Sequence, residues 1–165
     1  MTSRKPEELV TSFFANLARG DVDAALADTA ENIVYTNVSL PTVRGKARFA
    51  PLMRLLNGRH IAFDAQLLAI SADDQGVVLT ERYDELRIGP LRMQFWVCGR
   101  NEVRDGQIVV WRDYFDFFNC TKGLVRGLAA LVFPRLLPPL PDALSRMDLD
   151  RPGTNRLETN PAPQN

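Results

Sequence analysis

The sequence lacks the residues that several common enzyme chemistries require. Its 165 residues include one histidine, His60, so a metal site with two or three imidazole ligands cannot form within one chain. A Ser-His-Asp triad would have to use His60, which follows Asn57-Gly58-Arg59 in a predicted loop. No GxGxxG or GxxxxGK(S/T) motif occurs, which excludes the usual dinucleotide-binding and P-loop signatures.

Neither an excess of charge nor a disulfide framework is present. Lysine plus arginine and aspartate plus glutamate both number 20, and such a balance argues against nucleic-acid binding. The two cysteines, Cys98 and Cys120, have no CxxC spacing, and we expect buried, reduced thiols. With 45% apolar and 24% charged residues, the composition is typical of a soluble globular protein.

Long hydrophobic runs are also missing. The longest apolar region, residues 123–144, is interrupted by Arg126, Arg135 and four prolines, so we expect no membrane span. The first ten residues turn acidic before any apolar stretch begins, which is not the pattern of a signal peptide. These features favour a cytoplasmic protein.

The first 60 residues predict three helices and a strand. Pro6 and the two glutamates after it are typical of a first helical turn, and Gly20 ends that pattern. Asp21 can cap a short second helix, and residues 33–38 predict a strand. A third helix follows Gly45 and carries Phe49, Leu52, Met53 and Leu56.

The middle of the chain predicts an antiparallel meander. Four strand patterns occupy residues 61–71, 77–88, 91–104 and 108–118, and short turns join them. A helix at about residues 121–133 follows. Because helices come first and the meander afterwards, the order favours an α+β fold over alternating βαβ units.

The end of the chain differs in composition from the rest. Residues 134–165 hold seven of the eleven prolines, and residues 148–165 are polar and rich in proline and asparagine. We predict one domain over residues 1–147, with a disordered tail over residues 148–165.

One strand pattern carries an isolated carboxylate. Alternation over residues 108–118 places Asp113 on one face with Val109, Trp111, Phe115 and Phe117. A charge among bulky apolar side chains is costly unless hydrogen-bond donors hold it. The alternative is a structural aspartate that a neighbouring arginine or backbone amide satisfies.

Two further pairs share strand faces. Arg82 and Asp84 are two residues apart in one strand, and Tyr35 and Asn37 are two apart in another. A solvated ion pair, a core tyrosine and a strand-end asparagine are the simpler interpretations. Together with Asp113, the pairs can place two carboxylates, a guanidinium, a phenol and a carboxamide on one face. Such a set could open an epoxide with water, which needs one carboxylate as base and one carboxyl as acid.

These residues resemble the active site of the limonene-1,2-epoxide hydrolase family. Tyr35-x-Asn37, Arg82-x-Asp84 and Asp113 within the run WRDYFD match that family in order and approximate spacing. The resemblance covers about residues 6–133. It implies a cone-shaped, curved mixed sheet with N-terminal helices over its concave face, as in nuclear transport factor 2 and ketosteroid isomerase.

The resemblance also implies roles for the five polar residues. Asp113 would be the general base, and Tyr35 and Asn37 would hold the attacking water with it. Asp84 would be the acid that protonates the epoxide oxygen, and Arg82 would bridge the two carboxylates. Water would attack in one step, without a metal, an organic cofactor or a covalent ester, and the enzyme would be a homodimer.

The substrate expected from the sequence is a small apolar epoxide. Strand and helix parity suggest that its pocket is lined by Leu86, Phe95, Val97, Trp111, Phe115, Leu52, Met53 and Leu56. Two alternatives remain on the same fold: an isomerase or cyclase that shuttles a proton through one aspartate, and a binding module without catalysis.

Overall fold

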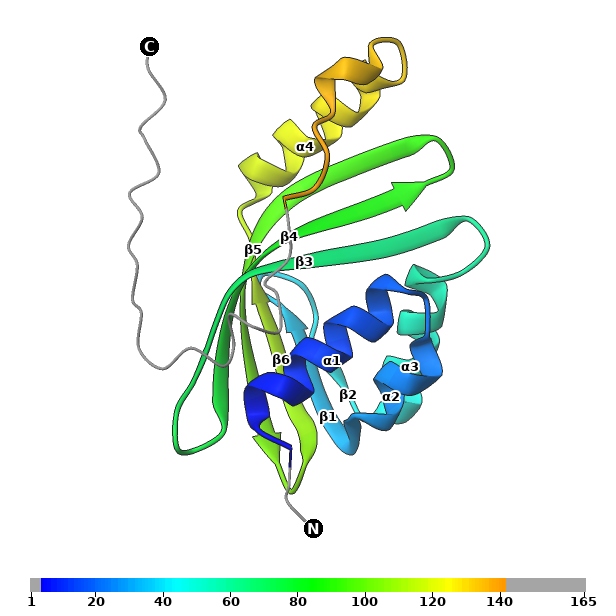
Figure 1. Cartoon of the computed structure of the whole chain (residues 1–165). Helices are drawn as coiled ribbons and strands as arrows, with labels where there is room; N and C mark the ends of the chain where they lie inside the picture. Colours follow the sequence, from blue (N-terminus) through cyan, green and yellow to red (C-terminus); the bar gives the residue numbers. More distant parts are fainter. Residues whose placement is uncertain (1–3, 142–165) are drawn as a thin grey trace.

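A computed structural model describes residues 4–141, and its strands and helices form the expected mixed α+β architecture (Figure 1). The predicted tail at residues 148–165, and the domain boundary before it, lie outside the described residues. Within the part that is described, no helix is both long and apolar enough to cross a membrane.

Three helices precede the main part of the sheet. They are α1 (Pro6–Ala18), α2 (Val22–Ala27) and α3 (Lys46–Leu56). Proline at the start of α1 is followed by Glu7 and Glu8, whose charges suit the positive end of the helix dipole. The side chain of Asp21 caps α2 by accepting a hydrogen bond from the Ala24 amide at 3.1 Å. All three helices agree with the sequence prediction.

Six strands form one curved sheet. They are β1 (Thr29–Asn37), β2 (Val43–Arg44), β3 (Ile61–Ala72), β4 (Val77–Ile88), β5 (Leu91–Arg104) and β6 (Gln107–Tyr114), in the order β2-β1-β6-β5-β4-β3. Strands β3 to β6 are antiparallel neighbours, which confirms the predicted meander, while β1 lies parallel to β6. The sheet curls around α1, α2 and α3, which lie on its concave side (Figure 1).

The core lies between these helices and the sheet. Trp111 on β6 is 2% exposed, and the rings of Phe13, Phe14 and Phe49 meet it edge-on with centroids 5.2 to 6.0 Å away. Edge-to-face contacts of this kind add about 0.5–1.5 kcal/mol per pair to the burial of the rings. They fix the helix layer on β6 beside Asp113.

The last strand is shorter than predicted. Strand β6 ends at Tyr114, so Phe115 lies in a connection and Phe117 begins helix α4 (Phe117–Ala130). The reason is local: the Asp116 side chain accepts a hydrogen bond from the Phe118 amide at 2.8 Å and caps α4. Consequently α4 begins four residues before the predicted start at residue 121.

A β-bulge changes the inner face of β6. Glu102 on β5 is opposite Val110, but Val103 is opposite Ile108, so Val109 is an extra residue on β6. Ile108 is fully buried in the core instead of Val109, which is half-buried. The expectation that Val109 shares the face of Trp111 and Asp113 was therefore wrong.

Helix α4 packs against β5 through glycines. A Cβ atom added at Gly123 would lie 2.3 Å from the Gln94 carbonyl oxygen, and one at Gly127 would lie 2.2 Å from that of Arg92. No larger residue fits at either position without moving the helix. A short 3-10 turn, η1 (Pro134–Leu136), follows α4.

Candidate active site

Three adjacent strands bring the predicted acidic and basic residues together. Arg82 and Asp84 lie two residues apart on β4, so their side chains share one face of the sheet. Gly99 on β5 is the register partner of both Thr80 on β4 and Asp113 on β6. The Arg82 side chain can therefore cross β5 at a residue without a side chain and reach Asp113.

The Arg82 guanidinium bridges the two carboxylates. Its Nε donates to Asp84 Oδ1 at 2.8 Å, and its Nη2 donates to Asp84 Oδ2 at 3.1 Å and also to Asp113 Oδ2. Arg82 is 0% exposed, Asp84 3% and Asp113 4%. This burial excludes the simpler interpretation of Arg82 and Asp84 as an ion pair exposed to solvent. A buried charge set of this kind depends on its mutual hydrogen bonds.

Aromatic side chains contact two members of this Asp84-Arg82-Asp113 cluster, Arg82 and Asp113. The Arg82 Cζ lies over the Phe14 ring, 4.5 Å from the ring centroid, in a cation–π contact. Trp111 Nε1 donates to Asp113 Oδ1 at 2.7 Å. Asp113 thus accepts from Arg82 on one oxygen and from Trp111 on the other, which fixes the orientation of its carboxylate.

Burial changes the protonation of Asp84. Desolvation raises the pKa of Asp84 to about 6, although the charge and hydrogen bonds of Arg82 lower it in part. Desolvation alone would lower the pKa of Arg82, but the charges of Asp113 and Asp84 outweigh it and raise that pKa overall. Arg82 is therefore a permanent cation, and Asp84 can be a neutral acid at mildly acidic pH.

Tyr35 and Asn37 lie on β1 next to the cluster. Tyr35 is the register partner of Trp111, and Asn37 that of Asp113. Burial, and then the negative charge of Asp113, raises the pKa of Tyr35, while a hydrogen bond with Asn37 lowers it in part. The phenol therefore keeps its proton and remains a hydrogen-bond donor. Tyr35 is 7% exposed and belongs to the core cluster, as the simpler interpretation expected, but it also reaches the cavity.

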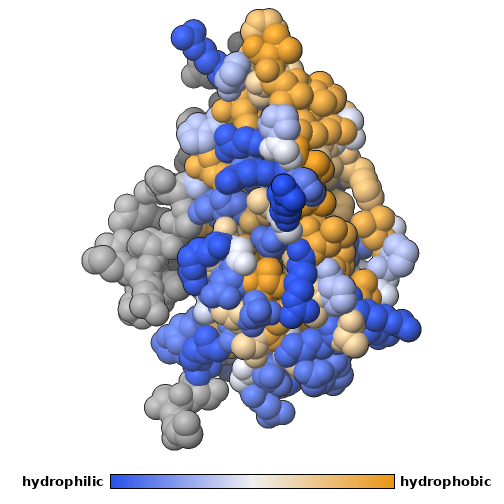
Figure 2. Space-filling view, turned by 90° about the vertical axis from the view of Figure 1, so that its right-hand side faces the viewer, coloured by the Kyte–Doolittle hydropathy of each residue, from blue (hydrophilic) through white to orange (hydrophobic). Residues whose placement is uncertain are grey.

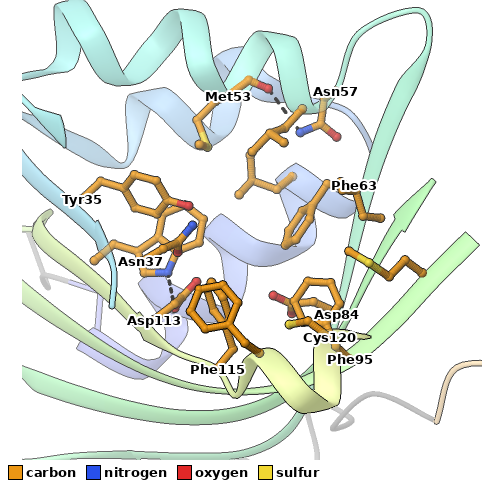
Figure 3. Close-up of a pocket in the computed structure, with 16 residues that line it drawn as sticks. Tyr35, Asn37, Met53, Asn57, Phe63, Asp84, Phe95, Asp113, Phe115 and Cys120 are labelled. Atoms are coloured by element: carbon orange, nitrogen blue, oxygen red, sulfur yellow. Dashed lines mark hydrogen bonds between the residues drawn. The ribbon is translucent and has the colours of Figure 1, made fainter. Parts of the chain in front are cut away.

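Tyr35, Asn37, Asp84 and Asp113 border a mostly apolar cavity of about 300 Å³ (Figure 3). Tyr35, Asn37 and Asp113 gather on one side of it, and Asp84 lies across from them (Figure 3). Six of the eight predicted apolar lining residues border it: Leu86, Phe95, Trp111, Phe115, Met53 and Leu56. Its volume is at the lower end of small-molecule sites, which run from about 300 to 1,000 Å³.

Two of the predicted lining residues do not reach the cavity. Val97 is the register partner of Arg82, and like Arg82 it is fully buried and does not border the space. Leu52 lies on α3 beside the two residues that do border it, and packs against the core instead. Parity therefore did not predict correctly that these two residues border the cavity.

Other lining residues were missed by the sequence analysis. They are Leu17, Asn57, Phe63, Met93, Phe117 and Cys120. Met93 lies two residues before Phe95, so the two side chains share one face of β5. The Gly89-Pro90 turn places Met93 opposite Leu86. The same alternation argument would therefore have predicted Met93 as a lining residue. Phe63 on β3 is also opposite Leu86, but the turn between β3 and β4 is longer, so the sequence did not predict how these two strands pair.

Both cysteines are half-buried free thiols rather than fully buried ones, because Cys98 lies on a partly covered strand and Cys120 borders the cavity. Burial raises the pKa of each thiol. Neither thiol is therefore a thiolate nucleophile under ordinary conditions.

Several buried polar atoms on β4 and β5, one of them on Arg82, have no hydrogen-bond partner among the described residues. Arg82 Nη1, Thr80 Oγ1 and both polar side-chain atoms of Asn101 are buried without a hydrogen-bond partner among residues 4–141. Arg82 is thus positioned by the two carboxylates in front and by aromatic faces. A Cβ atom added at Gly99 would lie 2.5 Å from Arg82 Nη1, so the cluster leaves no room for a side chain there.

Known proteins resemble this chain in sequence and in fold. Residues 4–126 match the family described as the limonene-1,2-epoxide hydrolase catalytic domain. Epoxide hydrolase EphG of Mycobacterium tuberculosis (strain ATCC 25618 / H37Rv) is 49% identical over 127 residues, which cover 77% of this chain and 84% of that protein. The solved structure of an M. tuberculosis LEH-like epoxide hydrolase has a TM-score of 0.78 and 46% identity, over 82% of this chain and 96% of that one.

More distant structures share only the fold. A putative polyketide cyclase from Xanthomonas campestris has a TM-score of 0.64 at 21% identity, over 74% of this chain and 96% of that one. The site and the close relatives define the class: the chain belongs to the limonene-1,2-epoxide hydrolase family. It is an epoxide hydrolase of that type.

Proposed function

We propose that the enzyme adds water to an apolar epoxide in a single step, with the Asp84-Arg82-Asp113 cluster as its acid–base machinery. Asp113 takes a proton from the water as the water oxygen attacks an epoxide carbon. Asp84 gives its proton to the epoxide oxygen as the carbon–oxygen bond breaks, so the product is a vicinal diol. The proton gained by Asp113 then returns to Asp84, and the cycle closes without a covalent intermediate.

The observation that carries this proposal is the bridge from one arginine to two carboxylates beneath an apolar cavity. The two carboxylates have different surroundings. Asp113 accepts hydrogen bonds from Arg82 and Trp111, whereas Asp84 accepts both of its hydrogen bonds from Arg82 and has a pKa raised by burial. Such a difference lets one group act as base while the other acts as acid at the same pH.

Tyr35 and Asn37 suit the binding of water. Both border the cavity on the side of Asp113, and the phenol keeps its proton. A water held by a phenol or carboxamide and by the Asp113 carboxylate would be oriented for attack. The aromatic and aliphatic lining favours a terpene, lipid or steroid epoxide, although its contacts discriminate little between substrates that differ by one methylene. A homodimer and a cytoplasmic location remain predictions.

The first test is diol formation from limonene-1,2-epoxide, cyclohexene oxide, styrene oxide and a longer lipid epoxide. Asp113→Asn removes the base but keeps the shape of the side chain, so we expect a rate loss of about a hundredfold or more. Folding and product affinity should persist. An Asp113→Asn variant with the activity of the native enzyme would contradict the assigned role.

The one-step route has its own isotopic signature. In a single turnover in oxygen-18 water, the diol should carry the label from the first cycle, because the attacking oxygen comes from water. A covalent ester would deliver an unlabelled enzyme oxygen first, and the label would then be found in the protein by mass spectrometry.

The pH dependence follows from Asp84. Its carboxyl is protonated below its pKa of about 6 and loses the transferable proton above it. We therefore expect kcat/KM to fall by about tenfold for each pH unit above that value. The folded state also holds this proton more tightly than the unfolded chain, so its contribution to stability falls as the pH rises from 3.8 to about 6. Epoxides do not ionise, and a flat profile would contradict the role of Asp84.

A further inference from the structure

Helix α4 exposes an unusual amount of apolar surface. We define the α4 face as six of the large apolar side chains that are exposed on this helix and just after it: Phe118, Leu124, Val125, Leu128, Val132 and Phe133. Val132 is 72% exposed and Phe118 69%. Figure 2 shows a continuous hydrophobic area over the upper part of the molecule, where α4 lies. Apolar patches of this kind mark interaction sites.

The orientation of α4 is fixed by its other side. Gly123 and Gly127 touch the carbonyl groups of β5 so closely that no side chain could replace them. The helix therefore docks on the sheet through its small residues. Rotating it to bury the α4 face would push leucine and valine side chains into the β5 backbone, so the apolar side must face outward.

Helix α4 and the described residues after it carry charges of one sign, and the nearest carboxylate along the chain is that of Asp116, which caps the helix beside Phe118. Residues 117–141 contain no aspartate or glutamate, while Lys122, Arg126 and Arg135 are all exposed. The Lys122 ammonium lies 5.3 Å from the Phe118 ring centroid, at the border of the face. Two copies meeting by this face would place like charges together, which opposes association. An anionic lipid surface would attract the same charges, and apolar side chains flanked by cations are typical of interfacial helices.

The α4 face adjoins the catalytic cavity. Phe117 and Cys120, in the first turns of α4, border the cavity on the inner side of the helix. We propose that the α4 face docks in the headgroup region of an anionic membrane, so that an apolar epoxide dissolved in the lipid passes to the cavity beside α4. The lipid origin of the substrate rests on the proposed function, whereas the docking itself does not.

Co-sedimentation with vesicles tests the docking directly. The full-length protein should bind vesicles of phosphatidylcholine and phosphatidylglycerol at least about tenfold more tightly than vesicles of phosphatidylcholine alone. Lys122→Gln with Arg126→Gln should weaken binding to the anionic vesicles by about 30-fold, at about 1 kcal/mol for each charge near the surface. Phe118→Ser with Val125→Ser should weaken binding as well, through the loss of buried apolar area.

A matched control uses exposed leucines elsewhere. Leu40 and Leu79 are 49% and 56% exposed, and neither lies on α4. Leu40→Ser with Leu79→Ser should leave vesicle binding unchanged. Equal binding of the native enzyme to neutral and anionic vesicles, or no binding, would overturn the proposal. So would binding that appears only after removal of residues 142–165, because the C-terminal segment would then occupy the α4 face.

Two further readouts separate the remaining explanations. If Phe118→Ser with Val125→Ser turns a dimer into a monomer while the native enzyme binds no vesicles, the face joins two copies and the proposal is wrong. Hydrolysis of cyclohexene oxide in buffer should be unchanged in all these variants, whereas hydrolysis of a lipid epoxide presented in anionic vesicles should fall by at least about tenfold in the α4 variants. If the native enzyme hydrolyses none of these epoxides, the result counts against the proposed function alone, because vesicle binding is measured separately by co-sedimentation.

Discussion

Arg82→Lys should lower diol formation by about a thousandfold or more, because it disturbs the proposed acid and the proposed base together. The guanidinium gives two hydrogen bonds to Asp84 and one to Asp113 from a single rigid fork. An ammonium on a flexible stem cannot reproduce that planar, two-carboxylate geometry, although it keeps the positive charge. One carboxylate would be left in the buried site without its donor.

The same substitution should also destabilise the protein. Losing one partner of a buried ion pair typically costs about 3–5 kcal/mol, so the melting temperature must be measured beside the rate. Arg87→Lys is a matched control, because Arg87 also lies on β4 and pairs with two carboxylates, those of Glu85 and Asp64, but it is 45% exposed and does not border the cavity. Its activity should be unchanged. An Arg82→Lys enzyme that keeps more than about a tenth of the native rate would contradict the bridging role.

The structure brings the five predicted polar residues close together, and strand alternation could group them within each strand because it is a local property. Residues two apart in a strand share a face whatever the rest of the fold does, and this rule joined Tyr35 to Asn37 and Arg82 to Asp84. The meander was equally local, because short turns leave little choice of partner. What alternation alone could not supply was the pairing of β1 with β6, a long-range parallel contact that brings Asn37 beside Asp113.

The sequence predictions were wrong where strand alternation is interrupted, and where the outcome depends on how deeply a side chain is buried. The bulge at Val109 and the helix cap at Asp116 both change the direction of side chains within a few residues, and neither has a unique sequence signature. Val97 has the right parity but lies beside Arg82, at a depth that depends on how the helices cover the sheet. Packing of that kind is a tertiary property that no local pattern encodes.

Gly99 was missed for a different reason, because its contribution is the absence of a side chain. Only the register shows that this glycine lies between Thr80 and Asp113, where the Arg82 side chain crosses β5. A Cβ atom added there would lie 2.5 Å from Arg82 Nη1, 2.6 Å from Thr80 Oγ1 and 3.1 Å from Asp113 Oδ1. The guanidinium is fully buried, so it has little room to give way.

Gly99→Ala should therefore lower diol formation by about a hundredfold or more, because a displacement of about 1 Å in a catalytic group costs a factor of that size. Cys98→Ala, one residue away on the same strand, changes a half-buried side chain that does not border the cavity and should leave the rate unchanged. Circular dichroism and a melting curve would establish that both variants fold.

A second variant separates a displaced arginine from a general packing defect. Thr80→Ala removes the hydroxyl that the new Cβ would meet, but it leaves the contact with Arg82 Nη1 in place. Combined with Gly99→Ala, it should recover part of the melting temperature and little of the activity. If the double variant instead regains the native rate, crowding against Thr80 was the cause of the loss, and the open path at Gly99 is not what holds Arg82 between its two carboxylates.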